Sequence, residues 1–343
     1  MRQRATQNRP MSQEPPAHSP DANDGLIYAW HIDGPEGQQP LDWKDLPPAT
    51  KRDALYWMHL DFEHPTVVKW LREQSSLDHA LLDYLIADDS RPGVFFHGNR
   101  LVMIMRGINT NVNAEPEDLI SLRLCLSPDR LLTFCRRRVQ TMEEIHQSYQ
   151  LGSGPLNPGD FVVDVITREV DRIGDHIEEI EEETLKMEMR LLNADDDGIS
   201  DSLQALQLDL IDLRRYLHPQ RSMLSRLLES HLEWLSEANY NRIRAQAEFH
   251  TSHVEDVDYC LQRAQLISER LDNRQNEDLN QKLYILAIVS CVFLPLSLIT
   301  GLLGVNLSGI PYSKEPHGFT ILTLTLFAIA GIILVYFKRK KWF

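Results

Sequence analysis

Three residues near the C-terminus have the chemistry to handle a hydrated metal ion. Gly304, Val305 and Asn306 follow a long uncharged run and precede a polar loop. If several copies of the chain meet around an axis, their Asn306 amides form a ring of carbonyl oxygens, which can accept hydrogen bonds from the water shell of a divalent cation. Gly304 permits close backbone approach or a positive φ, or it is a plain helix C-cap, and Val305 is expected to pack. The tripeptide is therefore a candidate selectivity filter.

The residues before this tripeptide repeat small or polar side chains at every seventh position. One series runs back from Gly304 and the other from Gly301, and together they comprise Ser297, Ser290, Leu283, Asn276 and Glu269, and Leu294, Ala287, Asn280 and Asn273. Side chains seven apart share one face of a helix that packs against other helices. Polar residues inside a membrane helix mark a pathway, but serine and glycine also let helices approach closely, so both interpretations stay open.

Two uncharged runs must position these residues. Leu283–Leu303 has 21 residues and Phe319–Phe337 has 19, and neither contains a charged residue. A bilayer core about 30 Å thick requires roughly 20 apolar residues in a helix. We therefore expect two transmembrane helices rather than a hairpin buried in a soluble protein. The basic tail Lys338–Phe343 predicts a cytoplasmic C-terminus, and two spans return the N-terminal part to the same side.

The position of the tripeptide between two terminal spans, followed by a basic tail, resembles the CorA-type divalent metal transporters. Their signature at this point is Gly-Met-Asn, and Val305 replaces the methionine here. The continuation Leu307–Pro311 is similar to the ZntB branch, which handles zinc, and Leu213–Arg221 also looks like a CorA-type segment. The resemblance extends from about Leu26 to Phe343. It implies a funnel-shaped homopentamer in the bacterial inner membrane that takes up zinc, with the proton gradient coupled to or stimulating uptake.

Charge is unevenly distributed along the chain. The net charge is −15, and residues 279–343 hold six Lys/Arg and one Glu, so residues 1–278 carry −20. An acidic body argues against nucleic acid as a partner. It attracts cations through its summed potential, although an acidic surface also simply maintains solubility. The four cysteines lack metal-site spacing and are expected to be free thiols, and no signal peptide is visible.

The fold class expected is an α+β cytoplasmic domain with long stalk helices and a C-terminal two-helix transmembrane hairpin. The expected segments are a disordered tail (1–24), an α/β domain (25–151), a helical domain with the stalk (160–282), two transmembrane helices (283–303 and 319–337) joined by the filter and a periplasmic loop (304–318), and a basic tail (338–343). Strands are expected at Leu26–Ile32, Ala54–Leu60, Gly93–His97, Leu101–Gly107, Leu119–Leu126 and Arg130–Cys135, and helices at Pro65–Gln74, Leu77–Ala87 and Val139–Leu151.

Beyond a Gly- and Pro-rich break at Gly152–Gly159 the pattern is entirely helical. Asp160–Leu192 and Ile199–Leu235 predict two antiparallel helices, and Pro219 could kink the second. From about Ala238 no glycine or proline occurs before Pro295. A single helix to Leu303 would join the body to the membrane, and it would act as a lever that passes metal-dependent shifts to the pore.

Several histidines are candidate metal ligands. His250 and His253 stand one turn apart with Glu255 beside them, and imidazole nitrogen is a ligand that zinc favours. His59 and His64 lie near Asp61, and His317 lies in the outer loop. Solvated histidines explain each group as well, because none has four ligands at the spacing of a structural zinc site.

No catalytic motif is present. The chain has neither a P-loop nor a nucleophile elbow, so we expect a transporter that needs no cofactor, not an enzyme. A two-span hairpin cannot enclose a pathway alone, so we expect a homo-oligomer in the lipid bilayer with Zn²⁺ as transported substrate. The alternatives are a Mg²⁺, Co²⁺ or Ni²⁺ channel gated by cytoplasmic metal, zinc efflux, and a module that the hairpin only tethers to the membrane.

Overall fold

The computed structural model describes most of the chain. The described residues are 25–34, 37–46, 54–75, 77–87, 91–111, 118–193, 198–305 and 316–339. The expected disordered tail (1–24), Asn306 and most of the loop that follows it lie outside this set. The chain divides into two compact units, the first ending at Ile267 and the second beginning at Ser268.

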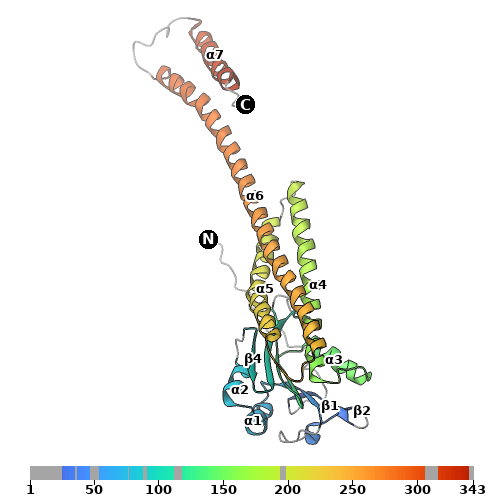
Figure 1. The fold of residues 1–343 in the computed structure, drawn as a ribbon. Coiled ribbons are helices and arrows are strands. Elements are labelled where there is room, and N and C mark those ends of the chain that lie inside the picture. Colours follow the sequence, from blue (N-terminus) through green and yellow to red (C-terminus); the bar gives the residue numbers. More distant parts are fainter. Residues whose placement is uncertain are drawn as a thin grey trace. The chain divides into compact units, whose positions relative to one another are not determined.

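A seven-stranded mixed sheet forms the base of the first unit (Figure 1). The strand order is β2-β1-β3-β7-β6-β5-β4; β3 and β7 pair in parallel, and every other neighbouring pair is antiparallel. The strands are β1 (Leu26–Gly34), β2 (Gly37–Pro40), β3 (Tyr56–Asp61), β4 (Gly93–His97), β5 (Arg100–Gly107), β6 (Ile120–Ser127) and β7 (Arg130–Cys135). All six expected strands are present, and the short edge strand β2 was missed.

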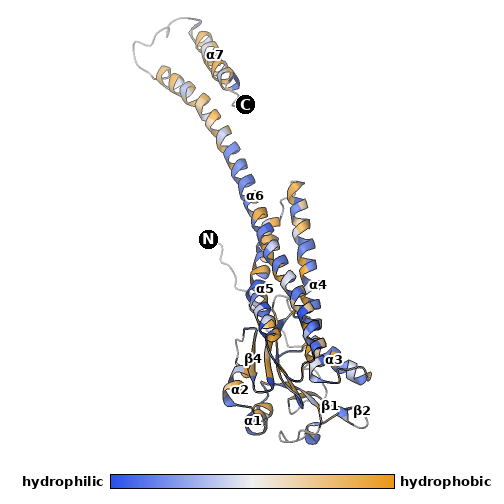
Figure 2. Ribbon diagram, viewed as in Figure 1, coloured by the Kyte–Doolittle hydropathy of each residue, from blue (hydrophilic) through white to orange (hydrophobic). Residues whose placement is uncertain are grey.

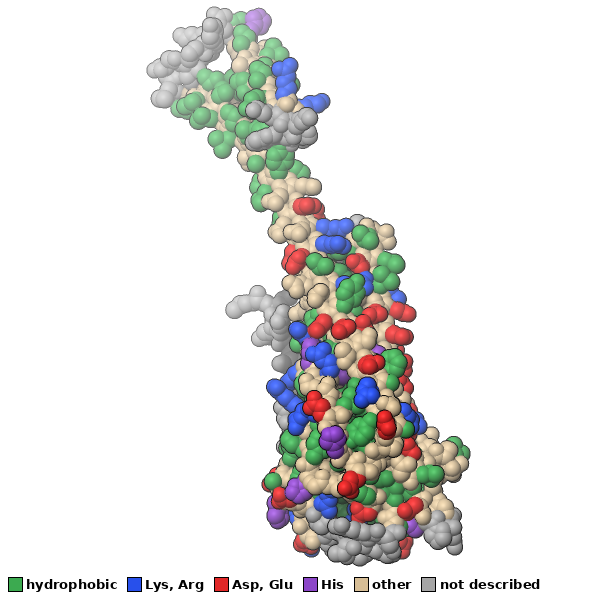
Figure 3. All heavy atoms as spheres, viewed as in Figure 1, with side chains coloured by type: hydrophobic (Ala, Val, Ile, Leu, Met, Phe, Trp, Pro, Cys, Tyr) green, Lys and Arg blue, Asp and Glu red, His purple; other side chains and the backbone are tan. Residues whose placement is uncertain are grey.

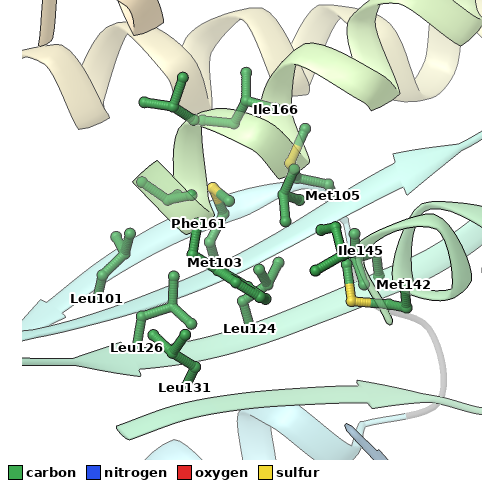
Figure 4. Close-up of a cluster of buried hydrophobic side chains, with 14 of the residues drawn as sticks. Leu101, Met103, Met105, Leu124, Leu126, Leu131, Met142, Ile145, Phe161 and Ile166 are labelled. Atoms are coloured by element: carbon green, nitrogen blue, oxygen red, sulfur yellow. The ribbon is translucent and has the colours of Figure 1, made fainter. Parts of the chain in front are cut away.

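Helices cover both faces of this sheet. They are α1 (Pro65–Gln74), α2 (His79–Ile86), α3 (Gln140–Gln150), α4 (Pro158–Leu192), α5 (Ile199–Leu228) and the long α6 (Glu237–Leu303), and a 3₁₀ turn spans Trp43–Asp45. Alternation along β5 shows the division. Leu101 and Met103 lie in the apolar cluster that includes residues of α3 and α4 (Figure 4). Val102 lies in the cluster that includes residues of α1 and α2. Each face thus buries its own apolar layer.

The Gly152–Gly159 break does not separate two cores. Phe161 and Ile166 of α4 pack in the same cluster as Met103 of β5 and Ile145 of α3 (Figure 4). Helix α4 begins there because the Asn157 side chain accepts a hydrogen bond from the Asp160 backbone N–H at 2.8 Å. The α/β part and the helical part up to Ile267 are therefore one structural unit.

Helix α5 ends seven residues earlier than the expected Leu235. The chain reverses between Glu229 and Ser236, where the Tyr240 hydroxyl accepts a hydrogen bond from the Leu232 N–H at 3.1 Å. Ser236 then caps α6, since its hydroxyl oxygen accepts a bond from the Asn239 N–H at 3.1 Å. Leu232 and Leu235 continue the apolar spacing of α5, but they belong to the turn. Both are buried in the same apolar cluster as the strands and α4, which explains why the sequence pattern extends past the end of the helix.

The second unit contains the end of α6 and helix α7 (Gly318–Arg339). Both helices have segments long and apolar enough to cross a membrane. Figure 2 shows mixed hydropathy along α4, α5 and the first part of α6, in contrast to the mainly hydrophobic end of α6 and α7.

Candidate functional site

The residues expected to form the filter lie at the C-terminal end of α6. The Gly304 N–H donates to the Thr300 carbonyl at 2.9 Å, so the helical bonding pattern extends through this residue. Gly304 does not adopt a positive φ, which removes that reason for a glycine here. A Cβ at Gly304 would lie 3.0 Å from the Thr300 carbonyl oxygen, closer than ordinary contact. Asn306 is not among the described residues, which break off at Val305 and resume at residue 316, so its placement is an expectation from the sequence.

The nine residues expected to line a pathway share one face of α6, and every one of them is exposed in the single chain. They are Asn273, Asn276, Asn280, Leu283, Ala287, Ser290, Leu294, Ser297 and Gly301. A Cβ added at Gly301 would meet no atom of the described residues within 4 Å. Nothing in the described chain covers this face, so it is available to other copies or to solvent.

The opposite face of α6 is the one that the chain buries. Ile243, His250, Val257, Ala264 and Leu271 recur every seven residues, and none is more than 6% exposed. Each precedes by five residues a member of the seven-residue series that runs through Glu269 and Asn276, or of its continuation toward the N-terminus; Leu271, for example, precedes Asn276. Each residue turns the helix by about 100°, so side chains five residues apart are separated by about 140° around the helix axis. Leu271 and Asn273, two residues apart, are separated by about 200°. The two series therefore occupy opposite sides of the helix.

The exposed face also continues further toward the N-terminus of α6 than the sequence analysis followed it. Continuing in steps of seven from Glu269 gives Gln262, Glu255 and Glu248, and the companion series continues through Leu266 and Tyr259; all are exposed. Leu266 and Tyr259 are 53% and 56% exposed. The burial pattern, which the sequence does not show, is what identifies them as members of this face.

The two membrane segments find little cover within the chain. Only 6% of the most apolar window in α6 is buried, and none of that in α7 is. The Thr300 hydroxyl donates to its own helix at Leu296, 3.0 Å away. An exposed apolar surface of this size requires lipid or further protein around it.

The histidine group on α6 does not form a metal site within the chain. His250 is buried and its Nε2 lies 3.1 Å from the Leu217 carbonyl oxygen, which it can donate to, whereas Glu255 is exposed on the other face. His253 packs against Gly174 of α4. Burial lowers the pKa of His250 to about 4, so the ring stays neutral. Within the described residues, no three His, Cys, Asp or Glu side chains are grouped to hold a metal.

The other histidines have local roles in the structure. His59 is buried, with Nδ1 2.8 Å from the Thr133 hydroxyl and Nε2 3.3 Å from the Cys135 sulfur. The Nδ1 of His64 accepts a hydrogen bond from the Thr66 N–H and so caps α1. His317 lies just before α7, and its carbonyl accepts a bond from the Ile321 N–H at 3.1 Å. The His317 side chain is exposed, and its role as an outer ion contact stays a prediction.

Comparison with known proteins agrees with this architecture. The family model described as CorA-like Mg²⁺ transporter protein matches residues 52–339. Among curated proteins, the zinc transport protein ZntB of Yersinia pseudotuberculosis is 28% identical over 316 residues, which cover 92% of this chain and 95% of that protein.

Solved structures show the same fold. The full-length CmaX protein has a TM-score of 0.79 at 29% identity and covers 93% of this chain and 98% of its own. The ZntB cytoplasmic domain from Vibrio parahaemolyticus has a TM-score of 0.65 at 23% identity, covering 74% and 99%. The CorA magnesium transporter of Methanocaldococcus jannaschii has a TM-score of 0.77 at 17% identity, covering 92% and 99%. The last two similarities bear on the fold alone.

Proposed function

Because this chain belongs to the family of CorA-like Mg²⁺ transporter proteins, we propose that it carries zinc across the bacterial inner membrane through a pore on the axis of a homopentamer. Zinc enters the cell, and the proton gradient is coupled to uptake or stimulates it. Zinc is the substrate here and not a resident cofactor. Membership in a family of transporters agrees with the expectation that the chain is not an enzyme.

The observation that carries this proposal is the exposed face of α6. As far as Leu271 one face of the helix is buried in the chain. From Asn273 to Gly301 the helix is largely uncovered, and the two heptad series place mainly small and polar side chains on one of its faces. A ring of copies whose α6 helices stand side by side would enclose this face as a wet path. Asn306 would then form the outer amide collar, and His317 would meet ions entering from the periplasm.

Zinc is favoured over magnesium by the relative at 28% identity, whose name is zinc transport protein ZntB. Val305 at the position of the usual methionine points the same way. The second candidate is a Mg²⁺, Co²⁺ or Ni²⁺ channel, which the description of the family favours. Moving a divalent cation inward across about 100 mV releases about 4.6 kcal/mol, and zinc efflux would have to work against that.

The basic tail and the two spans assign the body and both termini to the cytoplasm. Residues 304–318 then face the periplasm. The acidic body would raise the local concentration of cations at the inner end of the path, without requiring a discrete site.

Metal flux into proteoliposomes that contain the purified protein tests the proposal. We expect Zn²⁺ entry that exceeds Mg²⁺, Co²⁺ and Ni²⁺ entry and increases when protons are more concentrated outside. Faster Mg²⁺ entry that ignores the pH gradient would select the second candidate. No flux of any of these ions would leave the hairpin as a tether and overturn transport itself.

A further inference from the structure

Helix α4 carries an exposed stripe that is acidic along its first half and apolar along its second half. The stripe repeats at alternating steps of four and three residues and consists of Asp171, Asp175, Glu178, Glu182, Leu185, Met189 and Leu192. All seven side chains are exposed, and the three apolar ones are 45%, 52% and 70% exposed. A regular seven-residue repeat with apolar residues is typical of a helix that packs against another helix. No described part of the chain covers this α4 stripe.

Helix α5 carries a second exposed stripe with the same order of character but the opposite charge. Arg215, Ile211 and Leu208 share one face, with the exposed Asp212 at its margin, and the two apolar side chains are 52% and 57% exposed. Arg215 contacts the Tyr216 ring, and no described carboxylate pairs with it. Asp171, Asp175 and Glu178 likewise have no cationic partner in the described part of the chain. Each stripe therefore offers unpaired charge near the sheet and apolar surface farther from it.

The charged ends of the two stripes lie at the same level along the bundle that α4, α5 and the first part of α6 form. The His253 ring of α6 packs on Gly174 of α4, and His250, one turn earlier, contacts the Leu217 carbonyl of α5. Asp171 and Asp175 flank Gly174, and Arg215 is two residues from Leu217. In the view of Figure 3, acidic side chains follow the α4 side of the bundle and basic ones gather on the α5 side.

We propose that the α4 stripe of one copy docks on the α5 stripe of the next copy around the ring. This inference rests on the proposed function, because it requires a closed ring. In a ring the contact joins two different surfaces, and rotation about the axis keeps every residue at its own level. The acidic part of one stripe therefore meets the basic part of the other, and the apolar parts meet above them.

The other candidate surface for the α4 stripe is the exposed face of a neighbouring α6. That face presents Glu248 and Glu255 at the levels next to His250 and His253. Carboxylates would then face Asp171 and Asp175, and juxtaposed like charges oppose such a contact. The α5 stripe is thus the better partner, and it leaves the α6 face free for the axis.

Disulfide cross-linking between differently tagged copies tests this contact. In a Cys291→Ser background, one chain carries Leu185→Cys and the other Leu208→Cys, so the mixed disulfide can form only between copies. The matched control replaces Leu208→Cys by Gln262→Cys, on the exposed α6 face. We expect at least about five times more mixed dimer from the first pair, since a disulfide requires Cα atoms within roughly 7 Å.

The outcomes separate this contact from ring formation. Native mass spectrometry and zinc flux report whether the ring exists and conducts. An intact, conducting ring in which Leu185→Cys and Leu208→Cys do not cross-link, or in which the Gln262→Cys pair dominates, overturns this contact alone. A monomer in lipid overturns the proposed function as well. As a second measurement, Asp175→Arg should lower the temperature at which the ring dissociates, and adding Arg215→Asp should restore it; no restoration counts against the contact.

Discussion

The body and the membrane hairpin differ in how many of their contacts a single chain provides. In the body, the buried Arg123 guanidinium donates to the carbonyls of Leu85 and Ala87 at the end of α2, and burial lowers its pKa to about 10. Buried Glu169 accepts a hydrogen bond from Thr141 at 2.5 Å and has Arg172 within 3.6 Å. In the hairpin, Leu294 is 70% and Phe327 is 73% exposed. The core of the body is therefore packed within the chain, whereas the hairpin leaves large apolar side chains uncovered and needs lipid or other copies around it.

This contrast indicates that transport depends on contacts between copies of the chain. A buried seam on one side of α6 fixes the helix to the body, and the exposed side is left for assembly. Substitutions on the two sides should accordingly fail in different ways. On the exposed side they should change flux and leave the stability of the chain intact, and in the body they should change stability first.

The largest effect is expected at the filter. Asn306→Ala removes the amide oxygens that would hold the hydrated ion, so zinc flux into proteoliposomes should fall by at least about tenfold. Native mass spectrometry should show the oligomer unchanged. Asn193→Ala, at the end of α4, is the matched control and should leave flux near the parent value. Near-normal flux in the Asn306 variant would contradict the filter assignment.

The second prediction compares the effect on flux of the same substitution in α6 and in α7. Gly301 and Gly331 both have room for a Cβ in the single chain, since no atom lies within 4 Å. Gly301→Leu should narrow the path on the ring axis and lower flux by roughly tenfold, because a hydrophobic constriction excludes hydrated ions. Gly331→Leu on α7 should be nearly neutral for flux. Equal flux in the two variants would remove Gly301 from the pathway.

Strong local patterns made most of the fold predictable. The turn His97-Gly98-Asn99-Arg100 between apolar runs predicts the β4–β5 hairpin, and Gly98 does adopt the positive φ that such a turn requires. The two uncharged runs predict the two candidate membrane helices. Strand β2, with the sequence GQQP, has no apolar alternation to detect, and it forms because β1 offers it an edge.

The packing of α4 on the sheet and the role of the histidines were not predictable. The Gly152–Gly159 break has the composition of a linker, but the packing of Phe161 on the sheet depends on contacts distant in sequence. His250 and His253 have the spacing of metal ligands, yet the first is needed beside Leu217 and the second on Gly174. The filter assignment remains a prediction from the sequence and the family resemblance, since Asn306 lies outside the described residues.

In the body, a loss of stability is expected when a buried pair is broken. Arg172→Met leaves the Glu169 carboxyl buried without its cation, which should lower the free energy of unfolding by about 3 kcal/mol. Lys186→Met breaks an exposed pair with Glu182 and should cost less than about 1 kcal/mol. Denaturant unfolding followed by tryptophan fluorescence measures both. Similar values for the two variants would mean that the Glu169 network contributes little to the body.

The smallest effect concerns the pH dependence of the body. Burial lowers the pKa of His250 to about 4 from 6.5, His253 and Arg221 act in the same direction, and the contact with the Leu217 carbonyl opposes them. Between these two values the unfolded chain binds a proton that the folded chain does not. The stability is therefore fully present above about pH 6.5, and it falls with decreasing pH by up to about 1.4 kcal/mol per unit until the folded pKa is reached.

His250→Gln keeps a donor for the Leu217 carbonyl and removes the titrating group. Its free energy of unfolding should therefore decrease less steeply than that of the parent between pH 6.5 and 4. A residual slope should remain, because burial also lowers the pKa of His59, to about 3. The exposed His231→Gln variant is the matched control and should follow the parent curve. If the His250→Gln variant also follows the parent curve, His250 is reached by solvent or by another copy. The face of α6 that carries His250 would then not be sealed within the chain, and the contrast between the two faces of α6 would be lost.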